Sequence, residues 1–345
     1  MIRLSRIAET SGVVIALWNA SAHANVTFKL IPDPGTPQYA VDGFTAAANL
    51  WSTVLADNIT ITIEVGFTSL GPGIIGSTGP AFIEKSYTDV LAALQSHASS
   101  PDDLSSYAGL QLGPSYNRLI NHTSDNPNGA NSDVPYVDTM GRVGLTTANA
   151  KVLGLLPDDN SVDATIVFSP DFSFDFSHGT TINPGQYDFV GAAAHEIGHV
   201  LGFVSGVDDI DSLKGVYPGG DFSSNLVDLF RYSQASLAAG TGYPDYTADN
   251  RMKYFSVDGG IASVALFSNG LTYGDGHQAS HWKDNLGIGI MDPTAGLGER
   301  LSISPTDLRL FDVLGFTLAP EPGTGTIFGV GLLFLLVCRR CRRAE

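Results

Sequence analysis

The chain has 345 residues and carries 35 acidic against 18 basic side chains, a formal net charge of −17 at pH 7. This acidity argues against nucleic acid or an anionic membrane surface as a partner, because both would repel the protein. Residues 25–319 hold 12 basic and 32 acidic residues, a net charge of −20, which is consistent with calcium sites or with solubility in salt. Cys338 and Cys341 are the only cysteines, so the body of the chain has no disulfide and no thiolate metal ligand.

The N-terminus has the features of a secretory signal peptide. Two arginines precede a short apolar run from Val13 to Trp18, and Ala22-His23-Ala24 provides small residues at an Ala-x-Ala cleavage site. We therefore expect residues 1–24 to be a signal peptide that is cleaved off during export. The alternative is an ordinary buried N-terminal helix.

Hydrophobic periodicity in the first half of the body predicts alternating helices and strands. The expected elements are a helix capped by Asp42 and running through Leu55, a strand from Ile59 to Phe67, a helix from Ser86 to Ser96, and a strand from Ala164 to Ser169. Residues 71–80 are rich in glycine and proline, and residues 113–136 are polar and loop-like. The last of these strands is expected to bring a sheet close to the motif that follows it.

The most informative stretch is His195-Glu196-Ile197-Gly198-His199. Residues four apart share one face of a helix, so both histidines can direct a ring nitrogen at one metal ion while Glu196 lies beside it as a general base. Asp188 is the expected cap of this helix, and Gly202 is expected to end it in a left-handed turn. The pattern predicts a zinc-dependent hydrolase; the alternative is a buried helix whose histidines are satisfied by hydrogen bonds.

A hydrolytic zinc site needs a third protein ligand and one open position. Position 205, where the compact metzincin proteases carry their third histidine, is Ser205 in this chain. No glutamate occurs between Glu196 and Glu299, which argues against a thermolysin-like third ligand. The remaining candidates lie downstream: His281, which we favour, His277, and the cluster of Asp208, Asp209 and Asp211.

The favoured histidine is followed after ten residues by a methionine. The run His281-Trp282 and then Met291-Asp292-Pro293 resembles the distal half of the leishmanolysin type of metzincin, in which a long insertion separates the zinc helix from a third histidine and a methionine turn. The resemblance is limited to short motifs over residues 188–293 and the helix after them. Leishmanolysin-type proteases are usually rich in disulfides, so the likeness concerns the site.

What the resemblance implies for the site can be stated residue by residue. The implied zinc ligands are His195, His199 and His281, the catalytic residue is Glu196, and the structural residues near the site are Gly202 and Met291. In that family the methionine forms an apolar floor beneath the metal and is not a ligand. No tyrosine follows Met291 in this chain, so oxyanion stabilisation would come from the zinc or another group.

The predicted fold class is α+β, a metzincin-like two-subdomain protease with a mixed sheet, a central zinc-binding helix and a largely irregular C-terminal subdomain. We expect the subdomains over residues 25–206 and 207–318, with a last helix that opens at Ser304-Pro305-Thr306-Asp307 and ends near Gly315. The expected function is a secreted zinc-dependent endopeptidase acting on protein or peptide substrates. The alternatives are a catalytically inactive surface or matrix binding protein and a zinc amidase acting on a non-protein amide.

The C-terminal segment resembles a PEP-CTERM sorting tail. Pro320-Glu321-Pro322 leads into the apolar segment Gly323 to Cys338, which is followed by four arginines. Residues 319–345 are therefore expected to insert into a membrane with the arginines on the cytoplasmic side. The resemblance implies processing by an exosortase-type enzyme of a Gram-negative bacterium, with the product released or attached at the outer surface. A permanent single-span anchor is the alternative.

Overall fold

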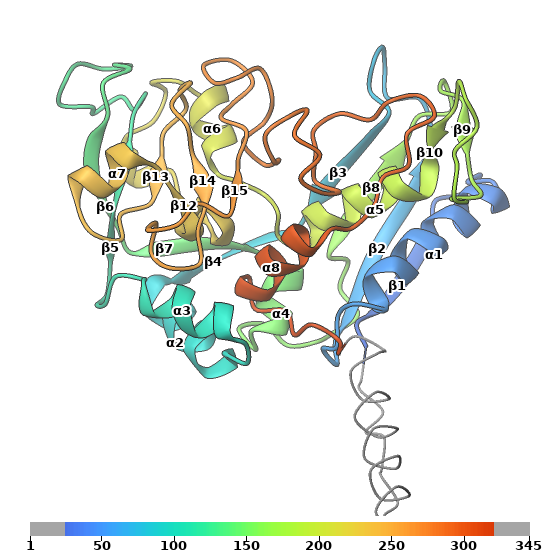
Figure 1. Cartoon of the computed structure of the whole chain (residues 1–345), viewed down its shortest axis with the longest axis horizontal. Coiled ribbons are helices and arrows are strands. Elements are labelled where there is room, and N and C mark those ends of the chain that lie inside the picture. The colour runs from blue at the N-terminus through green and yellow to red at the C-terminus, as the bar shows by residue number, and fades with distance from the viewer. Residues whose placement is uncertain (1–24, 321–345) are drawn as a thin grey trace, which may run out of the picture.

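The structure, a computed structural model, describes residues 25–320 (Figure 1). The expected signal peptide and almost all of the expected sorting tail, including its apolar segment, lie outside the described residues. Within residues 25–320, no helix is long and apolar enough to cross a membrane. The described part combines helices with several small sheets, in agreement with the α+β class expected from the sequence.

A four-stranded sheet carries the first part of the chain, in the strand order β1-β2-β8-β3. Its strands are β1 (Thr27–Pro32), β2 (Thr60–Phe67), β8 (Ala164–Phe168) and β3 (Gly76–Pro80). The first three strands run parallel, and β3 pairs antiparallel with β8 at the edge. The two strands expected from the alternating pattern, β2 and β8, are confirmed, whereas β3 lies within the segment noted only for its glycine and proline.

Two helices pack against each other beside this sheet: α1 (Gln38–Ser52) and α5 (Phe189–Val200), of which α5 also contacts β3 (Figure 1). The expected start of α1 at Asp42 is wrong, because the helix begins one turn earlier, directly after Pro37. Asp42 instead accepts a hydrogen bond of 2.9 Å from the Gln38 side chain. The Trp51 indole of α1 is fully buried and donates a 2.8 Å hydrogen bond to the backbone carbonyl of Ala194, which anchors α5.

The second part of the molecule is built from short strands in three-stranded sheets, with the orders β11-β7-β4, β13-β5-β6 and β12-β14-β15. A two-stranded pair, β10-β9, lies instead on the side of the four-stranded sheet, where β10 contacts α5 (Figure 1). The strands are β4 (Phe82–Ser86), β5 (Tyr116–Ile120), β6 (Tyr136–Met140), β7 (Arg142–Thr146), β9 (Phe174–Asp175), β10 (Tyr187–Asp188), β11 (Ser224–Asn225), β12 (Arg231–Tyr232), β13 (Asp245–Tyr246), β14 (Tyr254–Phe255) and β15 (Ala265–Leu266). The expectation of a loop over residues 113–136 is wrong, since it contains β5, which is held by backbone pairing on both sides. Strands from both sides of residue 206 pair with each other, so the two expected subdomains share sheets.

The remaining helices are short. They are α2 (Tyr87–His97), α3 (Pro101–Ala108), α4 (Thr147–Val152), α6 (Val207–Ser212), α7 (Gln234–Ala239) and α8 (Pro305–Val313), with 3-10 turns at Gly219–Asp221 and Leu226–Phe230. The expected starts of α2 and α8 are confirmed: the Ser86 hydroxyl accepts from the Asp89 amide, and the Ser304 hydroxyl accepts from the amides of Thr306 and Asp307. Gly315 follows α8 with φ +99°, as its predicted end requires.

Candidate metal centre

Helix α5 carries the His-Glu-x-x-His motif, and both of its ends lie where the sequence predicted. The Asp188 carboxylate accepts a hydrogen bond of 3.0 Å from the Gly191 amide, which satisfies one of the free donors in the first turn. Gly202 adopts φ +111°, and a Cβ built there would lie 1.9 Å from the Asn149 Oδ1, so only glycine fits this turn. Asn149 in turn donates to the Leu201 carbonyl at the end of the helix.

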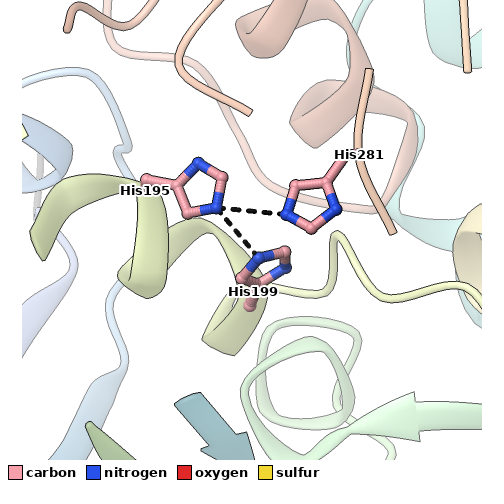
Figure 2. A group of neighbouring side chains, drawn as sticks. All are labelled: His195, His199 and His281. Carbon is pink, nitrogen blue, oxygen red and sulfur yellow. Dashed lines mark hydrogen bonds between the residues drawn. The ribbon is translucent and has the colours of Figure 1, made fainter. Parts of the chain in front are cut away.

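Three imidazoles converge at one point, two from α5 and one from the segment after β15 (Figure 2). The Nε2 atom of His195 lies 3.2 Å from that of His199 and 3.3 Å from that of His281. One nitrogen from each ring lies within 4.8 Å of the other two. The structure therefore brings together the three residues that the sequence proposed as ligands, although His281 is 82 positions after His199.

The backbone around the cluster determines which nitrogen of each ring carries its proton. The Nδ1 atoms of His195, His199 and His281 lie 2.8 Å, 2.8 Å and 3.2 Å from the carbonyls of Ile290, Phe203 and Gln278, respectively. A carbonyl oxygen can only accept, so each Nδ1 must donate, and in a neutral ring the Nε2 atom is then left with a free lone pair.

The environment of His199 and His281 favours the neutral form of their rings. Burial lowers the pKa of His199 to about 3, and burial also holds the pKa of His281 well below its usual range, with neighbouring imidazoles adding to both shifts. Lone pairs on adjacent Nε2 atoms at 3.2 and 3.3 Å repel each other and have no hydrogen between them. A cation coordinated by all three nitrogens removes this conflict, so the cluster is suited to hold a metal ion.

Glu196 lies on the same helix, between the two helical histidines in sequence. Its Oε2 atom accepts a hydrogen bond of 2.5 Å from the Thr78 hydroxyl of the edge strand β3. Burial raises the pKa of Glu196, while the nearby His195 and the Thr78 hydroxyl oppose this shift. Thr78 is a site residue that sequence reasoning missed, because the segment around it has little of the alternating hydrophobic pattern of a strand.

Met291 packs directly against the face of α5 that carries the two histidines. A Cβ built on Gly198 would lie 2.3 Å from the Met291 sulfur, so the methionine occupies the space that the glycine leaves free between the two histidines. Met291 is fully buried, and its carbonyl accepts a 2.9 Å hydrogen bond from the Trp282 amide, next to His281. Its position agrees with an apolar support beneath the three rings.

A buried carboxylate, that of Asp307 at the start of α8, connects the segment around His281 with the segment before Met291. It accepts hydrogen bonds of 2.8 Å from both the Trp282 indole and the Ile290 amide. Trp282 follows His281, and the Ile290 carbonyl accepts a hydrogen bond from the Nδ1 atom of His195. Asp307 therefore holds in place the residue after His281 and the residue that bonds the His195 ring, although the sequence identified it only as part of a helix start.

We expect Asp307→Asn to weaken metal binding by about 10–100-fold, the usual cost of losing an outer partner of a ligand, because an amide cannot accept from donors on both sides. Asp103→Asn is the matched control: Asp103 is equally buried, occupies the same capping position in α3, and bonds the Tyr107 hydroxyl far from the histidines. Competition titration with a chromogenic chelator measures the affinity, and thermal unfolding measures stability. Equal losses of metal affinity in the two variants would reduce Asp307 to a general structural residue.

The other candidate ligands lie elsewhere. The His277 ring faces the Asp284 carboxylate at 3.4 Å. Asp208 accepts from the amides of Ala279 and Ser280, and Asp211 accepts from the backbone of residues 272–273, so both support the loop that precedes His281. Asp209 does not belong to the cluster either. Among the described residues, the three histidines are the only group of potential ligands close enough to hold a metal ion.

A cavity of about 640 Å³ opens over the three rings and Glu196. Its lining includes the edge strand β3 with the loop before it, and residues 292–295, which follow Met291. The candidate centre therefore lines an open cavity, which we call the cleft. Comparisons of the chain with protein-family models, with curated proteins and with solved structures find no match.

Proposed function

We propose that this protein is a secreted zinc-dependent endopeptidase. The observation that carries the proposal is the convergence of three imidazoles beside Glu196. Nitrogens bound tetrahedrally to zinc at about 2.0–2.1 Å lie about 3.3 Å apart, close to the 3.2 and 3.3 Å that separate the Nε2 atom of His195 from those of the other two histidines. Three protein ligands leave the fourth position open, as a catalytic zinc site requires.

A bound zinc ion would supply Lewis-acid chemistry, polarising the scissile carbonyl and making a water molecule acidic enough to attack it at neutral pH. Glu196 then accepts the proton of the attacking water and returns it to the leaving amine. The Thr78 hydroxyl binds one carboxylate oxygen of Glu196, which lines the cleft, and the other oxygen has no hydrogen-bond partner among the described residues. The raised pKa of Glu196 suits a group that must both take up and release a proton.

The cleft supports a polypeptide as the substrate. Residues Gly76–Thr78 of β3 line it, and β3 pairs with only β8 within its sheet. An edge strand presents free backbone donors and acceptors, which an extended peptide can pair with while its scissile bond lies over the metal. A zinc amidase acting on a small non-protein amide has no need of such a strand, and a binding protein has no need of Glu196.

The arrangement of parts supports a metzincin-like architecture for this enzyme. A helix with two histidines, a distant third histidine and a buried methionine against that helix are the features that the leishmanolysin-type resemblance implies. The expected signal peptide and sorting tail support export to the outer surface of a Gram-negative bacterium, with processing by an exosortase-type enzyme. Both end segments lie outside the described residues, so the support for export and processing comes from the sequence alone.

Metal removal tests the proposal directly. We expect the purified protein to contain one zinc ion per chain, to cleave casein, and to lose this activity on treatment with a chelator and regain it with added zinc. The measurements are elemental analysis and release of acid-soluble peptides. Zinc without peptide cleavage would favour the binding-protein or amidase alternatives, and a protein that takes up no zinc would return the motif to a buried structural helix.

A further inference from the structure

A second cavity, of about 720 Å³, adjoins the first one. The two share Gln278 in their walls, and the second is bordered by Ser205, shortly after α5, and by Ser280, next to His281. Strand β4 follows β3 in the chain and lines the second cavity, just as β3 lines the first. The second cavity is therefore a continuation of the cleft beyond the candidate metal centre.

The walls of this cavity carry an excess of negative charge. Four carboxylates line it, those of Glu84, Asp208, Asp209 and Asp221, against the single guanidinium of Arg142. Arg142 is already engaged, at 3.0 Å from Glu84 and 2.8 Å from the Gly220 carbonyl. Asp209 and Asp221 are exposed, and among the described residues their side chains have no hydrogen-bond or ion-pair partner, so both carboxylates are available to a ligand.

The same cavity has apolar walls. Phe82, Leu213 and Tyr217 line it and are 45%, 38% and 45% exposed, respectively, although all three are large hydrophobic side chains. A ligand that combines an aliphatic stem with a cationic end would cover these side chains and meet the free carboxylates. The carboxylates do not form a compact group of metal-ligand atoms, which argues against a divalent cation as the ligand.

We propose that this second cavity binds a lysine or arginine side chain of the polypeptide substrate, within a few residues of the bond that is cleaved. The proposal rests on the proposed peptidase function and specifies its substrate class as polypeptides with basic residues. The acidity of the whole body, −20 over residues 25–319, adds a long-range attraction for such substrates.

The experiment uses an uncharged quenched-fluorescence peptide that the protein cleaves, and replaces one norleucine at a time by lysine on either side of the scissile bond. We expect lysine at one register to raise kcat/KM by about tenfold or more, an effect of the size that a well-placed charge pair produces. The double variant Asp209→Asn with Asp221→Asn should lose this preference, and Asp209→Lys should favour glutamate at that register. Asp42→Asn, which removes an exposed charge on α1, should leave the preference unchanged.

A protein that cleaves peptides with no preference at any register would overturn the proposal and leave the peptidase function intact. If no peptide is cleaved at all, the proposed peptidase function is wrong. The preference of the cavity for a basic side chain is then tested by peptide binding alone. Fluorescence anisotropy of labelled lysine and norleucine peptides on the Glu196→Gln protein then gives the answer. Tighter binding of lysine that disappears in the Asp209 and Asp221 variants supports the cavity, and equal binding refutes it.

Discussion

Glu196→Gln is expected to abolish peptide cleavage while the protein keeps its metal. Glutamine preserves the size of the side chain and can still accept from the Thr78 hydroxyl, but it cannot take a proton from water. General-base catalysis contributes about 10²–10⁴-fold, so we expect kcat to fall by that factor. The three histidine rings do not depend on the carboxylate for their own hydrogen bonds, so zinc content should stay unchanged.

Glu64→Gln is a matched control for this change. Glu64 lies on β2, in the sheet that also contains Thr78. Like Glu196, it faces a threonine hydroxyl, that of Thr165, at 3.5 Å. It does not line the cleft over the metal centre, and we expect normal turnover in this variant. Steady-state kinetics on one peptide, together with elemental analysis of the same samples, make the comparison. Undiminished cleavage by Glu196→Gln would remove the mechanism.

His281→Ala is expected to release the metal, whereas His277→Ala retains it. The first change removes one of three converging nitrogens and should weaken zinc binding by more than the roughly 10–100-fold that loss of an outer partner costs. Two histidines and water then remain as ligands, so activity should fall together with zinc content. The second change removes a ring from the same loop. This ring lies 3.4 Å from the Asp284 carboxylate and away from the three converging histidine rings.

Competition titration with a chromogenic chelator gives the zinc affinity of both variants. Circular dichroism and thermal unfolding of the metal-free proteins show whether the loop around residues 277–283 remains folded. Zinc held equally well by both variants would place the third ligand at another residue. Loss of zinc from both would mean that the loop as a whole, and not one imidazole, supports the site.

The local features of the site were predictable from sequence because their causes are local. Asp188 caps α5 through an amide three residues away, and Gly202 ends the helix because its backbone needs a positive φ. The relation between His195 and His199 follows from the helical period alone. The charge and polarity of the capping residues predicted the starts of α2 and α8 for the same reason.

Errors and omissions occurred where distant segments determine the structure. Strand β5 lies in a polar segment and is held by pairing with β6 and with β13, which is more than a hundred residues away. Strand β3 has the sequence Gly-Ser-Thr-Gly-Pro, which carries no strand signal, and it exists because β8 supplies backbone partners along its whole length. The Thr78 contact with Glu196 depends on that pairing and could not be read from the chain.

The sequence by itself determined the helix that carries His195 and His199, the place of Glu196 between them and a short list of candidate third ligands, because spacing within one helix and residue chemistry suffice for these. Only the tertiary structure separated His281 from His277, since the two differ by four positions and the packing of their loop decides which ring faces α5. The same holds for Asp307, for the Met291 contact with Gly198, and for the acidic cavity. Each of these depends on contacts between segments far apart in sequence, which composition and periodicity do not encode.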